Sequence, residues 1–187
     1  MEKDQQSETD QEFWVFGYGS LMWRPGFPHE ETQPALLRGY HRSMCILSIR
    51  YRGTPEKPGL VLGLEEGGEC MGRAYRVAPE HIADAVRYLQ DRELVTGVYL
   101  ERTLPVTLED GRVVDTYGFI ADKDHVQYRG ALTDREAAEI ILAGHGQEGP
   151  ARDYLANTVG HLEALGIHDV DLVRLLAIVD EAAQASR

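Results

Sequence analysis

A glutamate stands in the apolar stripe of a predicted helix that begins near Pro79. Ile82, Val86 and Leu89 occur at i, i+4 and i+7, the spacing of one buried helix face. Three turns of about 3.6 residues from the start of this stripe, the next position on the same face is Glu93. Because burying an ionised carboxylate costs free energy, this group needs hydrogen-bond donors or a raised pKa. A carboxyl group with a raised pKa in a pocket can act as a general acid and base.

The same pattern has a simpler interpretation. Gly97 follows closely, so the helix ends near this point. The side chain of Glu93 could therefore turn to solvent or pair with Arg92 or Arg87. The rival carboxylate, Asp91, lies about 200° from Glu93 around the helix and is expected to face water.

Two glycines interrupt the segment that follows a predicted buried strand near the N-terminus. Glycines let the backbone approach a ligand closely, and turns at such positions can point N–H groups at a carboxylate or an oxyanion. An ordinary turn after a strand has the same composition. We call residues 16–21 the glycine loop and treat them as candidate substrate-binding residues: Phe16, Gly17, Tyr18, Gly19, Ser20 and Leu21.

Arg50 and Arg52 lie in a predicted loop of a chain that is acidic as a whole. The chain has 31 Asp and Glu against 19 Lys and Arg, a formal net charge of −12. This charge repels nucleic acid and anionic lipid surfaces, so we expect no nucleic-acid partner and no membrane association. An anionic small molecule would need local cations, and the arginine fork suits a carboxylate. A solvated loop is the alternative for these two arginines.

Several common reaction centres do not fit the sequence. Gly17 and Gly19 begin like a dinucleotide-binding fingerprint, but Met22 stands in place of the third glycine. There is no phosphate-binding Gly-Lys-Ser or Gly-Lys-Thr, and Ser20 lacks the flanking glycines of a nucleophile elbow. The seven histidines include no pair at i, i+4. We therefore set aside a dinucleotide site, a phosphate-binding loop, a serine nucleophile and a zinc site.

The composition predicts a globular, cytoplasmic protein. Of 187 residues, 43 % are hydrophobic and 27 % charged, as is usual for a folded domain. No run approaches the about 20 apolar residues of a membrane span, and the polar N-terminus does not resemble a signal peptide. Cys45 and Cys70 are too few for a disulfide scaffold, so buried reduced thiols are expected. Residues 1–12 are expected to form a disordered tail before a single domain over 13–187.

Apolar runs and turn signals predict strands in the first two thirds of the chain. Gly67-Gly68 predicts a turn, and Asp110-Gly111 predicts a hairpin because both residues tolerate positive φ. The predicted strands cover residues 13–16, 44–49, 60–64, 72–77, 98–108 and 112–121.

Helix signals come between and after the strands. Thr133 and Glu136 form a capping box, and the helix expected after Asp169 carries a stripe of leucines and valine. Because strands come early and helices late, we predict an α+β fold. The predicted helices cover residues 79–94, 133–144, 150–165 and a last segment from 170 onward.

Several short segments between residues 13 and 179 occur in an order that can be compared with known families. They are Tyr18-Gly19-Ser20-Leu21-Met22-Trp23, Arg52-Gly53-Thr54 with Pro58-Gly59, Cys70-Met71-Gly72 before Tyr75, Arg92-Glu93, Tyr128-Arg129-Gly130, Asp153-Tyr154-Leu155 with Thr158, and Gly166-Ile167-His168-Asp169. In this order they resemble the ChaC-type γ-glutamylcyclotransferases. Tyr51, which precedes Arg52, departs from the usual family pattern of a histidine or another residue at this position. It is not a reacting position of the motif.

The resemblance implies a γ-glutamylcyclotransferase-like small mixed β-barrel with flanking helices. It also implies cleavage of the γ-glutamyl bond of glutathione to 5-oxoproline and cysteinylglycine, with no cofactor and no metal. By position, the glycine loop would bind the γ-glutamyl group through its backbone, and Glu93 would be the catalytic acid and base.

Two other functions stay open on the sequence. The same residues could act on other γ-glutamyl amides, with a leaving-group pocket lined by Arg50, Arg52 or Tyr128. The chain could also bind glutathione without turning it over. A carboxylate kept in an apolar stripe argues against a pure binding module, because it costs stability without chemical use.

Overall fold

The computed structural model describes residues 12–185. The predicted disordered tail lies outside the described residues except for Glu12. The carboxylate of Glu12 accepts a hydrogen bond from Nε1 of Trp14 at 3.0 Å.

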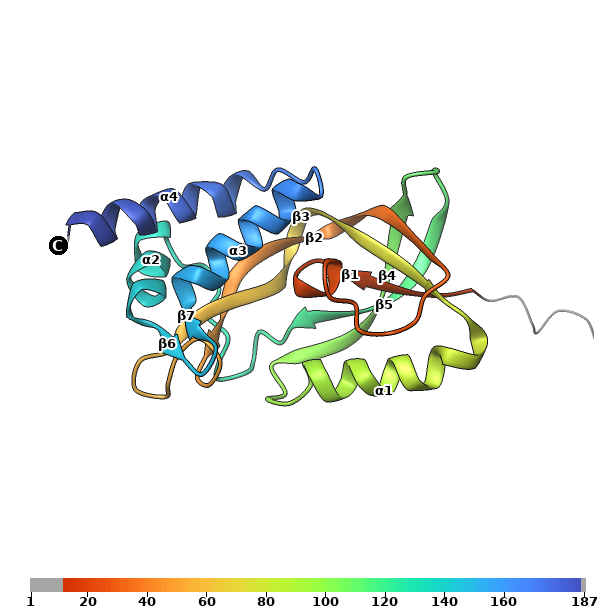
Figure 1. Ribbon diagram of the computed structural model, residues 1–187, viewed down its shortest axis with the longest axis horizontal. Coiled ribbons are helices and arrows are strands. Elements are labelled where there is room, and N and C mark those ends of the chain that lie inside the picture. The colour runs from red at the N-terminus through yellow and green to blue at the C-terminus, as the bar shows by residue number, and fades with distance from the viewer. Residues whose placement is uncertain (1–11, 186–187) are drawn as a thin grey trace, which may run out of the picture.

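Five strands close into a barrel in the order β1-β3-β2-β4-β5 (Figure 1). β1 pairs antiparallel with β3 and parallel with β5, so one parallel pair closes an otherwise antiparallel barrel. The α+β class and the small mixed barrel are confirmed. The strands are β1 (Phe13–Gly17), β2 (Glu31–Ser48), β3 (Gly59–Val77), β4 (Tyr99–Leu108) and β5 (Val113–Ala121).

The predicted turn at Gly67-Gly68 is wrong. β3 runs through both glycines without a break and pairs with β2 along its length. The register shifts where Gly39 of β2 faces these two residues, and all three glycines have positive φ. Positive φ at a glycine pair suits a β-bulge as well as a turn. Because β2 continues beside β3 on both sides of the glycine pair, the chain forms a bulge here and does not turn.

β2 is also much longer than its predicted counterpart, residues 44–49. It begins at Glu31 and ends at Ser48. Its first part has no regular alternation of apolar and polar residues and contains Pro34, which disfavours a strand. Long-range pairing with β3 and β4 overrides these local signals.

The helices were predicted more accurately than the strands, because their end signals are local. The capping box of Thr133 and Glu136 is present, and Leu172 N donates to the side chain of Asp169 at 3.1 Å. Figure 1 shows α2, α3 and α4 gathered at one end of the molecule, while α1 lies along the barrel. The helices are α1 (Ile82–Glu93), α2 (Asp134–Ala143), α3 (Ala151–Ala164) and α4 (Val170–Ala185).

Short elements complete the fold. A 3-10 turn, η2 (Pro79–His81), precedes α1, and another, η1 (Ser20–Met22), follows β1. β6 (His145–Gly146) and β7 (Gly149–Pro150) form a small hairpin before α3. Cys45 and Cys70 are buried free thiols, as predicted. No helix within residues 12–185 is both long and apolar enough to span a membrane.

Candidate active site

Glu93 is the last residue of α1. Leu89, one turn before it, is completely buried, and the side chain of Glu93 is 21 % exposed. The neighbouring Asp91 faces solvent, as the helical period predicts. Glu93 does not turn away to water; its Oε1 lies 3.1 Å from Nε of Arg92. The carboxylate is therefore largely buried and also paired.

Burial raises the pKa of Glu93, and the positive charge of Arg92 offsets only part of this effect. The raised pKa makes the carboxyl group a stronger base than an exposed glutamate, and a group that can also hold a proton during a reaction. This is the electrostatic state expected of a general acid and base.

Three tyrosines lie near enough to this carboxylate for its charge to act on them: Tyr18, Tyr99 and Tyr154, here called the tyrosine cluster. Burial raises the pKa of each, and the negative charge of Glu93 raises it further. For Tyr154 the pKa rises to about 12. All three hydroxyl groups are therefore neutral at physiological pH, so each keeps one O–H donor.

Leu62 of β3 ties two of these tyrosines to the barrel. The hydroxyl of Tyr99, on β4, donates to the Leu62 carbonyl at 2.6 Å. The hydroxyl of Tyr154, on α3, accepts from the Leu62 N–H at 3.3 Å. These contacts hold β4 and α3 against one point of β3 and fix the positions of both rings.

Arg92 links Glu93 to the glycine loop. Its Nη2 donates to Oγ of Ser20 at 2.5 Å, and its Nη1 donates to the carbonyl of Arg24 at 2.9 Å. The two features that the sequence showed separately, a carboxylate in a helix stripe and a glycine-rich turn, are thus joined by one guanidinium.

The glycine loop leaves the barrel and turns at once into η1. Phe16 and Leu21 are buried in two different parts of the core, so they anchor the loop at both ends. The first hydrogen bond of η1 runs from Met22 N to Gly19 O at 2.9 Å. The N–H groups of Ser20 and Leu21 come before it, at the start of the turn, where helices leave donors free for other partners.

Of the three residues predicted for the leaving-group pocket, Arg52 lies directly against a ring of the tyrosine cluster. Its guanidinium lies over the ring of Tyr154, 5.6 Å from the centroid, and its side chain is 16 % exposed. Arg50 is exposed and lies over Tyr51. The hydroxyl of Tyr128 donates to the carboxylate of Glu65, and its ring packs against the same group of buried residues as Tyr99.

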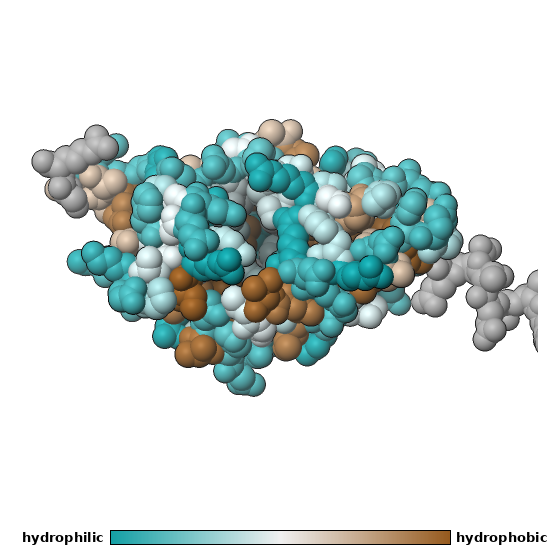
Figure 2. Space-filling view, turned by 60° about the horizontal axis from the view of Figure 1, so that its bottom comes forward, coloured by the Kyte–Doolittle hydropathy of each residue, from teal (hydrophilic) through white to brown (hydrophobic). Residues whose placement is uncertain are grey.

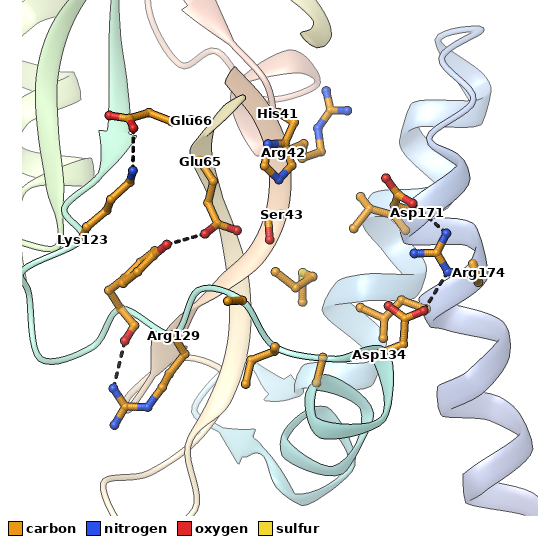
Figure 3. Close-up of a pocket in the computed structure, with 17 residues that line it drawn as sticks. His41, Arg42, Ser43, Glu65, Glu66, Lys123, Arg129, Asp134, Asp171 and Arg174 are labelled. Atoms are coloured by element: carbon orange, nitrogen blue, oxygen red, sulfur yellow. Dashed lines mark hydrogen bonds and ion pairs between the residues drawn. The ribbon is translucent and has the colours of Figure 1, made fainter. Parts of the chain in front are cut away.

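The face of the molecule along which α1 runs is hollowed near its centre, and mostly hydrophilic residues border the hollow (Figure 2). A cavity of about 460 Å³ lies between the barrel and helices α2 and α4. Its carboxylates already have partners: Glu66 pairs with Lys123, and Arg174 pairs with Asp134 and Asp171 (Figure 3).

Among residues 12–185 no three His, Cys, Asp or Glu side chains converge in a way that could hold a metal ion. Within the described chain, the polar groups gathered at Glu93 are the tyrosine cluster and the arginines just described. Such a set can move protons and donate hydrogen bonds.

Sequence reasoning missed two members of the site. Tyr99 lies in an ordinary strand pattern, so nothing in its surroundings in sequence distinguishes its hydroxyl from that of a surface tyrosine. Arg92 was part of the family resemblance and was weighed as an ion-pair partner of Glu93, but its bond to Ser20 was not foreseen. Tyr154 was part of the family resemblance but had no role assigned to it.

The chain matches the family described as ChaC-like protein over residues 13–182. It is 38 % identical over 166 residues to the glutathione-specific γ-glutamylcyclotransferase of Escherichia coli (strain K12), covering 89 % of this chain and 72 % of the relative. It is 32 % identical over 174 residues to glutathione-specific γ-glutamylcyclotransferase 1 of Homo sapiens, covering 91 % and 78 %. The crystal structure of the glutathione-specific γ-glutamyl cyclotransferase from yeast matches with a TM-score of 0.82 at 26 % identity, covering 91 % of this chain and 99 % of that one. With the barrel and the match over most of its length, this chain belongs to the ChaC-like family.

Proposed function

We propose that this protein is a cytoplasmic γ-glutamylcyclotransferase that converts glutathione to 5-oxoproline and cysteinylglycine. The observation that carries the proposal is Glu93, a largely buried carboxylate with a raised pKa, which Arg92 connects to the glycine loop. The names of the relatives support glutathione as the substrate.

Glu93 is the proposed acid and base. The α-amino group of the substrate has a pKa of about 8, so it is mostly an unreactive ammonium near neutral pH. Ionised Glu93 takes a proton from this group, and the freed amine attacks the γ-carbonyl carbon of the same glutamyl unit. A new C–N bond closes the five-membered lactam. Protonated Glu93 then gives its proton to the cysteinyl nitrogen as the original amide bond breaks. The surplus proton left on the ring nitrogen follows the same route through the freed carboxylate, so the product is a neutral lactam and the dipeptide leaves with its amine as an ammonium.

The glycine loop is proposed to hold the γ-glutamyl chain curled and to stabilise the oxyanion. Because the attack is intramolecular, correct orientation can contribute a large share of the about 7–11 kcal/mol available from this source. The N–H groups of Ser20 and Leu21 can donate to the developing oxyanion, a contribution of about 3–4 kcal/mol for a good donor. No nucleophilic side chain takes part in this scheme.

Arg52 is the candidate for recognition of the leaving group. It is the cation that adjoins Tyr154 of the tyrosine cluster, and its fork suits the terminal carboxylate of a dipeptide. This contact would favour glutathione over γ-glutamyl amides that lack a carboxylate at that distance.

The test is product analysis with purified protein. Glutathione and γ-glutamyl-alanine are offered separately, and 5-oxoproline is measured. We expect a higher kcat/KM for glutathione. Equal values would show that the enzyme acts on γ-glutamyl amides in general, and glutathione binding without any product would identify a binding module instead.

A further inference from the structure

Arg42, in the middle of β2, is a buried cation outside the acid-base site. Its side chain is 3 % exposed. The guanidinium makes three hydrogen bonds to three parts of the chain: Nε to Tyr18 O at 2.6 Å, Nη2 to Met71 O at 2.7 Å, and Nη1 to Oδ2 of Asp169 at 2.8 Å.

Asp169 completes this arrangement from the start of α4. Its Oδ2 accepts from Arg42, while its Oδ1 accepts from the N–H of Leu172, one of the free donors of the first turn. Both carboxylate oxygens are thus used. One residue caps the helix and also neutralises the buried guanidinium, which would be strongly destabilising if left unpaired.

The contact with Tyr18 affects the geometry of the glycine loop directly. A peptide unit is planar and trans, so the carbonyl of Tyr18 and the N–H of Gly19 point in opposite directions. Holding the carbonyl oxygen therefore sets the direction of that N–H and the start of η1. The planar guanidinium can satisfy three acceptors only if they keep fixed relative positions, which makes the contact a geometric restraint.

We propose that Arg42 and Asp169 form a positioning pair that fixes the Tyr18–Gly19 peptide, so that the start of α4 controls how the glycine loop binds substrate. This inference rests on the proposed function, because the loop is where the γ-glutamyl group would lie. Neither residue touches substrate; both act through the loop backbone.

The principal test is Asp169→Asn. Asparagine offers one oxygen, so it can keep either the helix cap or the bond to Arg42, but not both. We expect KM for glutathione to rise and kcat/KM to fall by about ten- to a hundredfold, the scale of a small misplacement at a distance from the chemistry. A rise in KM cannot come from a smaller folded fraction, because KM does not depend on enzyme concentration.

Asp171→Asn is the matched control. Asp171 lies two residues later in the same helix, is 71 % exposed and pairs with Arg174. We expect wild-type KM and kcat for this variant. Arg42→Lys is the second test variant, because lysine keeps the charge opposite Asp169 but loses the fork. We expect its KM to rise as well.

Wild-type KM and kcat in both Asp169→Asn and Arg42→Lys would overturn the positioning pair. Hydrogen exchange at the amides of Met22 and Arg24, which donate to Gly19 O and Ser20 O, tests the pair without activity. We expect faster exchange in both variants but not in Asp171→Asn. Unchanged exchange would also overturn it. Wild-type protein that forms no 5-oxoproline from glutathione would instead refute the proposed function, and the exchange experiment would still decide on the pair.

Discussion

Glu93 at the end of α1 and Asp110 in the turn between β4 and β5 each lie beside an arginine that is close in sequence. Oε1 of Glu93 is 3.1 Å from Nε of Arg92, and Oδ2 of Asp110 is 2.8 Å from Nη2 of Arg112. Their pKa values nevertheless move in opposite directions. Burial raises the pKa of Glu93, whereas the hydrogen bond from Arg112 holds the pKa of Asp110 well below its usual range.

The difference lies in access to water. The side chain of Asp110 is 41 % exposed, so its ionised form keeps its hydration and gains the arginine. That of Glu93 is 21 % exposed, so the loss of hydration outweighs the effect of its arginine. An arginine beside a carboxylate therefore does not show whether the group is structural or reactive; burial decides.

The largest expected effect is on kcat, and it should distinguish the reactive carboxylate Glu93 from the structural carboxylate Asp110. Glu93→Gln keeps the shape of the side chain but removes the base, so kcat should fall by at least about a hundredfold with little change in KM. Asp110→Asn should leave kcat at the wild-type value. Steady-state kinetics with glutathione gives both results. Turnover near the wild-type rate in Glu93→Gln would exclude Glu93 as the acid and base.

A smaller effect is expected from Arg92→Gln, which removes the positive charge beside Glu93 and leaves the effect of burial unopposed. Arg92 lowers the pKa of Glu93, so its removal should raise that pKa and move the acidic limb of the kcat profile to higher pH. Loss of the bond to Ser20 should reduce turnover at neutral pH on the order of tenfold.

The control for this variant is Arg87→Gln on the same helix. Arg87 is exposed and pairs with Asp84 at 3.6 Å, so its removal should leave the pH profile unchanged. If both variants show the wild-type limb, Arg92 does not influence the ionisation of Glu93.

The smallest effects concern stability, and the two carboxylates should show opposite signs. For Glu93 the folded pKa lies above the ordinary value of 4.5. Between these values the folded state binds more protons than the unfolded state, so the free energy of unfolding falls as pH rises. Glu93→Gln should therefore gain Tm relative to wild type as pH increases from 4.5 to neutrality.

For Asp110 the folded pKa lies below the ordinary value of 3.8. Its stabilisation is complete above that value and is lost as pH falls through the folded pKa. Asp110→Asn should thus lower Tm at neutral pH and make no difference in strong acid. Thermal unfolding of both variants over a pH series checks the signs. If the Tm difference from wild type changed in the same direction with rising pH in both variants, the comparison would be contradicted.

Local signals predicted several parts of the fold accurately. The capping box at Thr133, the hairpin at Asp110-Gly111 and the inward position of Glu93 each depend on a few neighbouring residues, and each is present. The bulge at Gly67-Gly68 was mistaken for a turn because the outcome depends on a partner strand that is distant in sequence.

The sequence by itself determined the helical period that aims Glu93 inward, the capping signals, and the order of segments that marks the ChaC-like family. Only the tertiary structure decided that Tyr99 and Tyr154 lie near that carboxylate, that Arg92 also holds Ser20, and that Arg42 reaches both Tyr18 and Asp169. The physical reason is that a helical period acts over a few residues, whereas these side chains come together only when the barrel closes and α3 and α4 pack against it.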